Sequence, residues 1–466
     1  MWTIHGKSSP LFLATVVLVV FPLVALTACK GKGRAPVKTQ KTEQTPTPAQ
    51  YLQVNFITWN EDYLPTLKKE VPLFEKETGV KVNWQILSED IVRDKVLIDL
   101  ASGAGKFDLV LTDVWILPEH IASNYLEPLD SFIAEDSRFN RDNWYLKYLD
   151  ALSYDGHLYA LPTESFGPAL VYRKDLFIKY GVKVPTNMSE LIAAAKRLTL
   201  DTNGDGKIDI YGIASRGKAG EEPAIVVSGF AYAYGGTWFE NGAATQEEIR
   251  RLKAKPAFDS PAFFNGFKTY TDLLRNYGPP GSKDYTWYEL IEDGRKGTAA
   301  MILNCGFNVG ALDKLEVGMR DKYAAALPVR GPAGFTQEDF AMGYGINRSS
   351  SHKKEAWQFL NFITSDIFMQ GIVDNYVTSI PIRALVEGEK YRSMHPYKTS
   401  DGRYVMEESV KVIDWRYMPH IPEYSVIANL LGTATSEVIA GKKTAHEALH
   451  ELNAAVLKLM QRSGYY

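Results

Sequence analysis

Beyond residue 50, the chain switches repeatedly between a hydrophobic pattern with the period of a β-strand and one with the period of an α-helix. Leu52, Val54 and Phe56 alternate with polar residues, which predicts a strand with one buried face. From Leu64 to Phe74 the apolar residues recur every three or four positions, and Gly79 is placed to end that helix. We therefore expect a strand followed directly by an amphipathic helix.

The same order of elements then repeats. Residues 80–86 alternate again, residues 89–102 have helical spacing, and residues 107–113 form a continuous apolar strand. This order is typical of a doubly wound α/β unit with a parallel sheet. Ligands of such sheets meet the loops that follow the strands, which here are residues 59–62 and 113–115.

A second α/β unit is predicted after residue 165. The pattern predicts strands over 168–177, 209–215, 298–304 and 323–329, and helices over 186–199, 261–277 and 351–363. Ser189 is placed to cap the first of these helices, and two helices joined at Gly441 close the chain. Two domains also fit the length of 466 residues, because one hydrophobic core seldom organises more than about 300.

A short apolar run precedes all of these elements. Residues 11–26 are almost wholly apolar, whereas a helix needs about 20 such residues to cross a bilayer. A weakly basic start, a short apolar stretch and small residues are typical of a secretory signal peptide. The segment Leu26–Cys29 resembles a bacterial lipobox, which implies that residues 1–28 are removed and that Cys29 is lipidated. A transmembrane anchor and an ordinary cleaved signal are the alternatives.

The segment after Cys29 is polar and basic. Residues 30–50 contain five Lys or Arg and one Glu, and they bury too little apolar area to offset the entropy of ordering. We expect residues 29–50 to be a disordered tether, although a solvated linker without further meaning has the same composition. The protein would then be exported and lipid-anchored, on the periplasmic or extracellular face of a membrane.

Composition excludes some partners. Hydrophobic residues make up 45% of the chain and charged residues 23%, as in a soluble globular protein. The net charge of −3 is too small to indicate a nucleic-acid partner. The cysteines are Cys29 and Cys305, so lipidation of the first leaves no internal disulfide. The 26 Tyr and 9 Trp could supply the aromatic faces of a carbohydrate site, or simply the core.

Several stretches, taken in order, resemble one known family. They are FEKETGVKV, DLVLTD with SNYLEPLD, DGHLYALPTESFGPALVYRKDLF, GRKGTAAMILNCGFN, MGYGINRSSSHKKEAWQFLNFIT, and MPHIPEYS with AGKKTAHEAL. Over nearly the whole chain from about Gln53, they resemble the extracellular solute-binding proteins of family 1, the sugar receptors of ABC importers. The stretches YGIASRGKAG, YGGTWFENG and YTDLLRNYGPPG further resemble the mannitol- and sorbitol-binding branch.

The resemblance implies an α/β protein with the two-lobed periplasmic-binding-protein type II fold. Each lobe would be a doubly wound sheet with helices on both faces, and the lobes would close by a hinge motion around a ligand in the cleft. One lobe would contain residues 51–163 and about 341–400, and the other residues 164–340 and about 401–466. The crossings would fall near Glu164, near Ala341 and around Asp401.

The implied function is that of a substrate-binding lipoprotein. It would capture a sugar or a sugar alcohol and, as a monomer, deliver it to the permease subunits of an ABC importer. No cofactor would be required and no reaction would occur on this chain. A lipoprotein that senses a solute for a signalling partner is the alternative.

Enzyme motifs are scarce in the sequence. G-x-S-x-G does not occur, and ASGAGKFD at 101–108 lacks the glycine spacing of a phosphate loop. A carbohydrate-active enzyme with paired carboxylates stays a minor alternative, since any Asp or Glu could serve.

Sugars and polyols present many hydroxyl groups and a weakly apolar C–H face. Carboxylates, amides, Arg and aromatic rings are the side chains that bind them. From these residue types and their places in the family pattern, the candidate ligand-binding residues are Trp59, Asn60, Glu61, Asp62, Asp113, Trp115, Glu164, Arg216, Trp238, Asn304, Phe307, Tyr344 and Arg383. The structural alternatives are a plain surface loop at residues 59–62 and ordinary packing of Trp115.

One departure from the family bears on ligand size. Maltodextrin binders place a stacking Trp after the stretch that reads IPEYS here, and the aligned position is about Ala428. Phe307 also stands where many relatives have Trp. Both differences favour a small ligand over a long glucan.

The stretch DTNGDGKIDIYG, residues 201–212, resembles part of a calcium loop. The candidate metal residues are Asp201, Asn203, Asp205, Lys207 and Asp209, while the Glu expected at the twelfth position is replaced by Gly212. A structural calcium ion is one hypothesis, and a turn between a helix and a strand is the other.

Overall fold

The computed structural model describes residues 52–59, 63–165, 167–303, 317–375, 380–394 and 401–466. Among these residues, none of the helices combines the length and the hydropathy needed to cross a bilayer.

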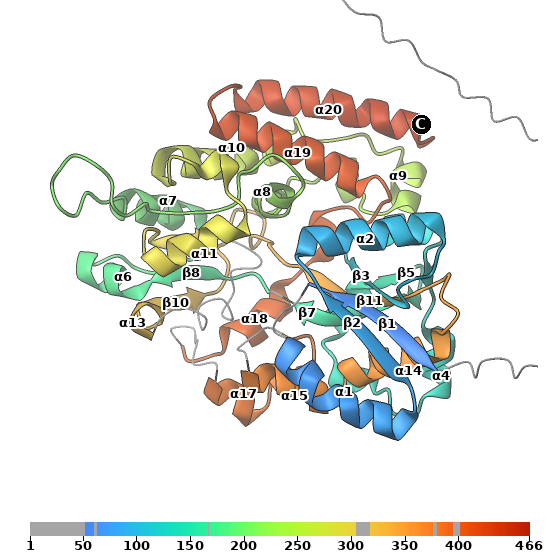
Figure 1. Cartoon of the computed structure of the whole chain (residues 1–466). Helices are drawn as coiled ribbons and strands as arrows, with labels where there is room; N and C mark the ends of the chain where they lie inside the picture. The colour runs from blue at the N-terminus through green and yellow to red at the C-terminus, as the bar shows by residue number, and fades with distance from the viewer. Residues whose placement is uncertain (1–51, 60–62, 166, 304–316, 376–379, 395–400) are drawn as a thin grey trace, which may run out of the picture. The chain divides into compact units, whose positions relative to one another are not determined.

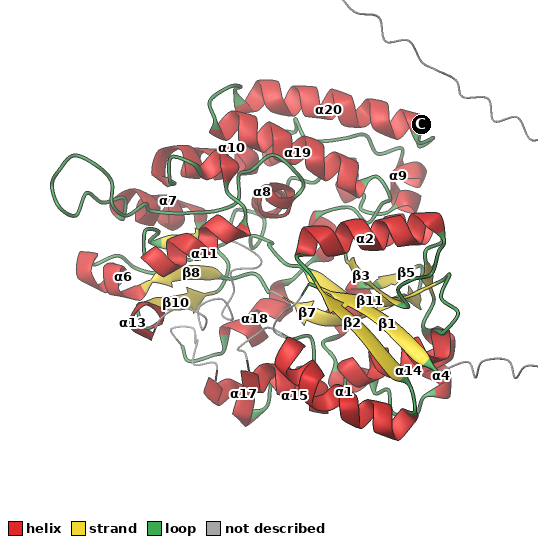
Figure 2. Cartoon of the chain, in the orientation of Figure 1, coloured by secondary structure: helices red, strands yellow, loops and turns green. Residues whose placement is uncertain are grey.

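Helices and short strands follow one another along the chain (Figure 2). The strands are β1 (Gln53–Thr58), β2 (Lys81–Ile86), β3 (Leu109–Asp113), β4 (Leu126–Glu127), β5 (Ser153–Tyr154), β6 (His157–Leu158), β7 (Ala160–Ser165), β8 (Leu170–Arg173), β9 (Met301–Leu303), β10 (Tyr323–Ala326) and β11 (Ala341–Asn347). The helices up to residue 300 are α1 (Leu64–Thr78), α2 (Glu89–Ser102), α3 (Leu117–Ala122), α4 (Asp130–Glu135), α5 (Leu146–Ala151), α6 (Lys174–Tyr180), α7 (Met188–Arg197), α8 (Glu222–Ala233), α9 (Gln246–Leu252), α10 (Pro261–Tyr277) and α11 (Trp287–Lys296). Those that follow are α13 (Val317–Arg320), α14 (Lys353–Ile363), α15 (Asp366–Asn375), α16 (Arg383–Val386), α17 (Glu389–Met394), α18 (Val405–Val412), α19 (Tyr424–Ile439) and α20 (Ala445–Arg462).

The larger sheet has the strand order β2-β1-β3-β11-β4, and β7 pairs with β11. β1 runs parallel to β2 and β3, whereas β11 is antiparallel to β3, β4 and β7. Helix α2 lies on one face of this sheet and α1 and α14 lie on the other (Figure 1). The predicted order of strand, helix, strand, helix and strand from residue 52 to residue 113 is thus confirmed. Its parallel strands end at the loops after Thr58 and Asp113.

The second sheet is smaller and antiparallel, with the order β10-β8-β9. The strand predicted over 168–177 is shorter than expected and covers only Leu170–Arg173, because the chain turns into helix α6 at Lys174, where Arg173 forms an ion pair with Asp175. The strand predicted over 209–215 was wrong. That segment makes only single bridges, such as Tyr211 to Ala299 and Ala214 to Ile302, and Gly212 is pressed against the backbone of Ala195 on α7.

The predicted cap of α7 is also corrected. The side chain of Asn187 accepts the hydrogen bond from the backbone N–H of Glu190 and caps the helix. Ser189 lies one residue inside the helix, and its hydroxyl donates to the Asn187 side chain at 2.7 Å. An Asn two positions earlier is the better N-cap because its carbonyl oxygen reaches the third backbone N–H.

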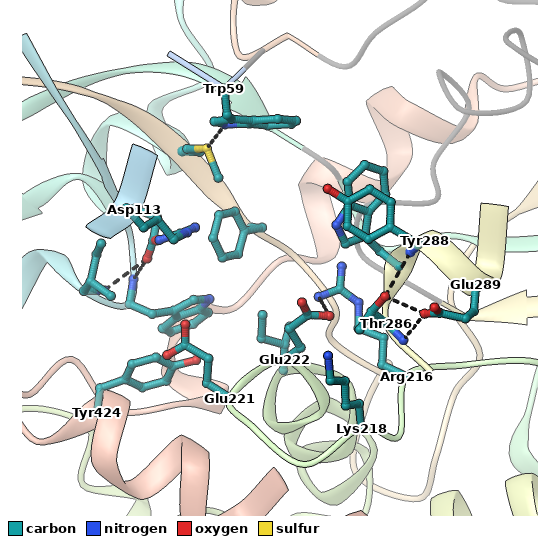
Figure 3. Close-up of a pocket in the computed structure, with 17 residues that line it drawn as sticks. Trp59, Asp113, Arg216, Lys218, Glu221, Glu222, Thr286, Tyr288, Glu289 and Tyr424 are labelled. Atoms are coloured by element: carbon teal, nitrogen blue, oxygen red, sulfur yellow. Dashed lines mark hydrogen bonds and ion pairs between the residues drawn. The ribbon is translucent and has the colours of Figure 1, made fainter. Parts of the chain in front are cut away.

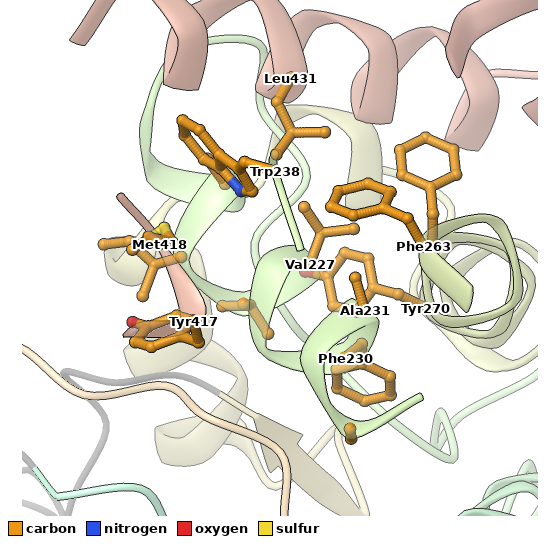
Figure 4. Close-up of a cluster of buried hydrophobic side chains, with 14 of the residues drawn as sticks. Val227, Phe230, Ala231, Trp238, Phe263, Tyr270, Tyr417, Met418 and Leu431 are labelled. Carbon is orange, nitrogen blue, oxygen red and sulfur yellow. The ribbon is translucent and has the colours of Figure 1, made fainter. Parts of the chain in front are cut away.

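Two hydrophobic cores interleave along the chain. One draws on residues 54–161 and 342–391. The other draws mainly on residues 170–341 and 410–465, and it also takes Trp115 and Tyr148 from the first part of the chain. In this second core α8 packs between α10 and α19, and Trp238 lies among Val227, Met418 and Leu431 (Figure 4). The fold is therefore mixed α/β and two-lobed, with the chain passing between the cores more than once.

Candidate functional site

A cavity of about 390 Å³ lies between residues of the two cores. Loops and elements around the larger sheet supply one set of lining residues: Trp59, Arg93, Asp113, Trp115, Ile116, Phe340 and Met342. The second set comes from the loop before α8, from α8 itself, and from the starts of α11 and α19: Arg216, Lys218, Glu221, Glu222, Ile225, Thr286, Trp287, Tyr288, Glu289 and Tyr424. Figure 3 shows Trp59 and Asp113 apart from Arg216, Glu222 and Tyr288 across the cavity.

Asp113 ends β3 and is fixed by three hydrogen bonds. Its Oδ1 accepts from the backbone N–H groups of Trp115 and Ile116 at 2.9 and 3.0 Å, and its Oδ2 accepts from Nη1 of Arg93 at 3.0 Å. The carboxylate is buried, and Arg93 reaches it from α2. Because the backbone bonds hold the aspartate rigidly, the guanidinium group beside it is also held at the cavity wall.

Trp115 follows at once and lies at the centre of an aromatic cluster. Its indole is 1% exposed and is stacked on Tyr424, with ring centroids 5.6 Å apart. Tyr424 is also stacked on Trp238, with ring centroids 5.7 Å apart and nearly parallel planes. Of these three rings, those of Trp115 and Tyr424 line the cavity.

Charged residues line the opposite side. Nη1 of Arg216 lies 3.3 Å from Oε2 of Glu222, and Lys218 lines the cavity on the same loop. Burial raises the pKa of Glu221 to about 7, and the negative charges of Asp113, Glu222 and Glu119 act in the same direction, while Arg93 opposes them. The cavity thus contains paired charges and one carboxyl group that titrates near neutral pH.

Two aromatic residues complete the lining at the start of α11. Thr286 caps this helix in a capping box with Glu289, which fixes the turn that carries Trp287 and Tyr288. The two rings lie 4.1 Å apart, and Tyr288 is 53% exposed. Across the cavity, the indole N–H of Trp59 donates to the sulfur of Met342 at 3.1 Å, which leaves the face of its ring toward the cavity (Figure 3).

The structure brings four of the sequence-predicted site residues together in this cavity: Trp59, Asp113, Trp115 and Arg216. Asn60, Glu61, Asp62, Asn304 and Phe307 lie outside the described residues, as does Cys29.

The other four predicted residues do not line the cavity. Trp238 is buried behind Tyr424 and donates from its indole nitrogen to Ser228 at 2.8 Å. Tyr344 is buried in β11 and donates to the hydroxyl of Thr58 at 2.6 Å. Arg383 donates to the backbone oxygen of Asp142 at the surface, and Glu164 is buried opposite Met342 in the β7–β11 ladder. Their ligand-binding role stays a prediction without support from the cavity lining.

Sequence reasoning missed most of the charged and aromatic lining: Arg93, Lys218, Glu221, Glu222, Trp287, Tyr288 and Tyr424. Arg93 and Glu221 sit in or beside helices, where a charged residue is ordinarily taken for a solvated face. Tyr424 could have been predicted from the sequence, because it lies in the IPEYS stretch, four residues before Ala428, where maltodextrin binders place a stacking Trp. Ala428 itself is buried in the core, so the aromatic ring that this helix offers to the cavity belongs to Tyr424.

The acidic oxygens of the candidate calcium loop accept hydrogen bonds from the loop itself. Asp201 accepts from the backbone N–H groups of Gly204 and Gly206, and Asp209 accepts from the backbone and hydroxyl of Thr202. Within the described part of the chain, no group of three or more His, Cys, Asp or Glu is arranged to hold a metal ion. Turn formation alone accounts for these residues, and calcium binding stays a prediction.

Comparisons with known proteins agree with this geometry. The model of a family described as bacterial extracellular solute-binding protein matches residues 58–368. The mannitol-binding protein of Pseudomonas aeruginosa is 25% identical over 429 residues, which cover 87% of this chain and 92% of that protein.

Solved structures share the fold. A solute-binding protein of an ABC transporter from Agrobacterium radiobacter, in complex with ribitol, superimposes with a TM-score of 0.75 at 24% identity and covers 88% of this chain and 98% of its own. A second solute-binding protein, from Agrobacterium vitis with bound D-mannitol, superimposes with a TM-score of 0.73 at 24% identity. The match covers 89% of this chain and 99% of that protein's chain.

Proposed function

This chain belongs to the family of bacterial extracellular solute-binding proteins, and on that premise we propose that it captures a small sugar alcohol and delivers it to an ABC importer. The family consists of binding proteins and not of enzymes, so the cavity is a binding site. The observation that carries the proposal is the lining of the cavity, in which fixed polar groups alternate with aromatic faces.

The electrostatics of the cavity favour a neutral ligand with many hydroxyl groups. Arg93 is paired with Asp113, and Arg216 is paired with Glu222, so that each guanidinium group is already neutralised. Paired charges of this kind offer strong donors and acceptors in fixed positions without a net charge that would attract an ion. The aromatic face of Trp59, which is turned toward the cavity, suits the C–H side of a polyol.

The relatives narrow the ligand class. The three similar proteins described above were found with, or named for, mannitol or ribitol, which are acyclic and neutral. A volume of about 390 Å³ lies at the lower end of the range of small-molecule pockets, which supports a small polyol over a long oligosaccharide.

Anchoring and docking follow from the same proposal. Membership of an extracellular family means that the protein is exported. We propose that Cys29 carries the lipid anchor, that residues 29–50 are its tether, and that the membrane permease is the partner to which the ligand is handed. Incorporation of labelled palmitate, and its loss in Cys29→Ser, would test the anchor.

The test of the ligand class is a binding screen on the purified full chain. Thermal unfolding and calorimetric titration would be measured with mannitol, sorbitol, ribitol, monosaccharides and maltooligosaccharides. A ligand at a hundredfold excess over its Kd should add about 2.7 kcal/mol to the free energy of unfolding. Stabilisation by the polyols is the expected result.

A matched pair of variants locates the effect. Arg216→Ala removes a cavity guanidinium group and should abolish the stabilisation, whereas Arg295→Ala removes an exposed one that pairs with Glu292 on α11 and should leave it unchanged. Stabilisation by oligosaccharides alone would contradict the small-ligand proposal. No stabilisation by any of these compounds would remove carbohydrate as the ligand class.

A further inference from the structure

The segment that enters β11 contains a buried carboxyl group that the cavity lining does not account for. Residues 336–339 are all buried, and Glu338 is 2% exposed. No described residue makes a hydrogen bond to either of its carboxyl oxygens. Such a group is costly to bury unless a hydrogen-bonding partner is supplied.

The side chains on either side of Glu338 find their partners away from the cavity. The Gln337 side chain donates to the backbone oxygen of Val412 at 3.0 Å and accepts from the backbone N–H of Asp414 at 3.1 Å. Asp339 acts electrostatically on the core residue Tyr148. Residues 337 and 339 therefore face the core and the 412–414 segment, whereas Phe340 and Met342, two and four positions after Glu338, line the cavity.

Glu338 also lies near a cavity residue of opposite charge. Burial raises the pKa of Glu338 to about 8, and Arg216 is the charged group that opposes this rise. Arg216 lines the cavity and forms its ion pair with Glu222. A carboxyl group that keeps its proton near neutral pH can both donate and accept a hydrogen bond, as a ligand hydroxyl can.

We propose that Glu338 is a specificity-determining residue of this site, whose carboxyl group binds one hydroxyl group of the polyol beside Arg216. The proposal rests on the proposed function and deepens it, since it assigns a ligand contact to a residue of the segment that joins the two cores. A ligand hydroxyl would satisfy the carboxyl oxygens that no described residue satisfies.

The test is a cycle of ligand and protein changes. Affinities of the full chain for the best polyol of the screen, and for analogues that each lack one hydroxyl group, would be measured by calorimetry. In the parent protein, one of these analogues should bind about 10- to 100-fold more weakly, which corresponds to a hydrogen bond with a strongly polar partner. In Glu338→Ala, the polyol should bind about that much more weakly, and the same analogue should lose little further affinity.

Glu338→Gln retains the shape of the side chain and keeps the test decisive if the alanine variant does not fold. It should retain part of the discrimination, because an amide both donates and accepts. Asp339→Asn is the matched control, since this adjacent acid faces Tyr148, and its Kd should stay within about threefold of the parent.

The outcomes separate the two claims. Binding of polyols by the parent protein, with unchanged affinity and unchanged discrimination in both Glu338 variants, would overturn this inference alone. A uniform loss of affinity for every analogue would also overturn it, because Glu338 would then act on the fold or on Arg216 and not on one hydroxyl group. Failure of the parent protein to bind any polyol would overturn the proposed function together with this contact.

Discussion

Glu221 lies in the cavity wall with its carboxyl group among other acids. Burial, together with Asp113, Glu222 and Glu119, raises its pKa to about 7, although Arg93 opposes the rise. A raised pKa means that the folded state holds the proton more tightly than the unfolded state does. The stability that Glu221 contributes is therefore complete below pH about 4.5 and is lost as the pH rises to about 7.

The variant Glu221→Gln should remove this loss. At pH 8 its free energy of unfolding should exceed that of the parent by up to about 3 kcal/mol, and at pH 4.5 the two should be nearly equal. Urea unfolding at both pH values would measure the difference. The exposed Glu247 on α9 supplies the control, because its environment changes little on unfolding. An equal effect of Glu221→Gln at both pH values would contradict the titration.

Single residues also show where sequence reasoning reached its limit. Trp115, after a predicted strand, and Trp238, after two glycines, were both candidate ligand-binding residues. The structure stacks both on Tyr424, but Trp115 lines the cavity and Trp238 does not. Burial of this kind depends on which helix packs over a ring, and no local pattern contains that information.

At the scale of elements, the strongly periodic segments were predicted well. The alternation up to Ile86 and the helical spacing over residues 89–102 correspond closely to the observed strands and helix. The strand prediction for residues 209–215 was wrong, because β-branched and aromatic residues there suggested a strand. The segment is instead held by single bridges and by the packing of Gly212 against α7. Apolar content predicts burial more reliably than it predicts pairing.

Helix α8 depends on one close approach. A Cβ atom at Gly229 would lie 1.6 Å from the backbone oxygen of Gln337, in the segment that carries Glu338. Gly229→Ala should therefore force the helix and this segment apart and lower the free energy of unfolding by about 1–3 kcal/mol or more. It should also weaken ligand binding, since Ile225 of α8 and Phe340 and Met342 of the segment that follows Gln337 line the cavity.

The matched control for Gly229 is Gly318 in helix α13, where a Cβ atom would meet nothing within 4 Å. Gly318→Ala should be neutral or slightly stabilising, because alanine restricts the unfolded chain. Chemical unfolding of both variants, side by side, would measure the contrast. A destabilisation of equal size in both would mean that the close contact with Gln337 is not the cause.

For the whole molecule, the two α/β units could be predicted from the pattern, but their interleaving could not. Strand β11 lies between β3 and β4 although more than 200 residues separate it from them in sequence, and only the family resemblance implied this crossing. The lobe boundaries near residues 163, 341 and 401 stay a prediction. They agree with the composition of the two cores, because residues 342–391 pack with the first part of the chain.

The assembled molecule should be sensitive to acid through two buried histidines, His120 in α3 and His420 beside Trp115. Burial lowers the pKa of His120 to about 4 and, with Arg416 nearby, that of His420 to about 4. A lowered pKa means that the unfolded state binds the proton more tightly. The stability that each neutral ring contributes is complete above pH about 6.5 and is lost as the pH falls to about 4, by up to about 3 kcal/mol for each ring.

The free energy of unfolding, measured between pH 7 and pH 4.5, should therefore fall steeply in the parent protein. The His420 ring packs at right angles to the ring of Trp115. The substitution His420→Gln should flatten the dependence of the unfolding free energy on pH by removing one of the two titrations, even if the variant is less stable at pH 7. The exposed His450 is the control, and His450→Gln should leave the slope unchanged. If His420→Gln kept the slope of the parent, the acid sensitivity would have to come from other groups, and a neutral His420 would not be part of what holds the Trp115 cluster together.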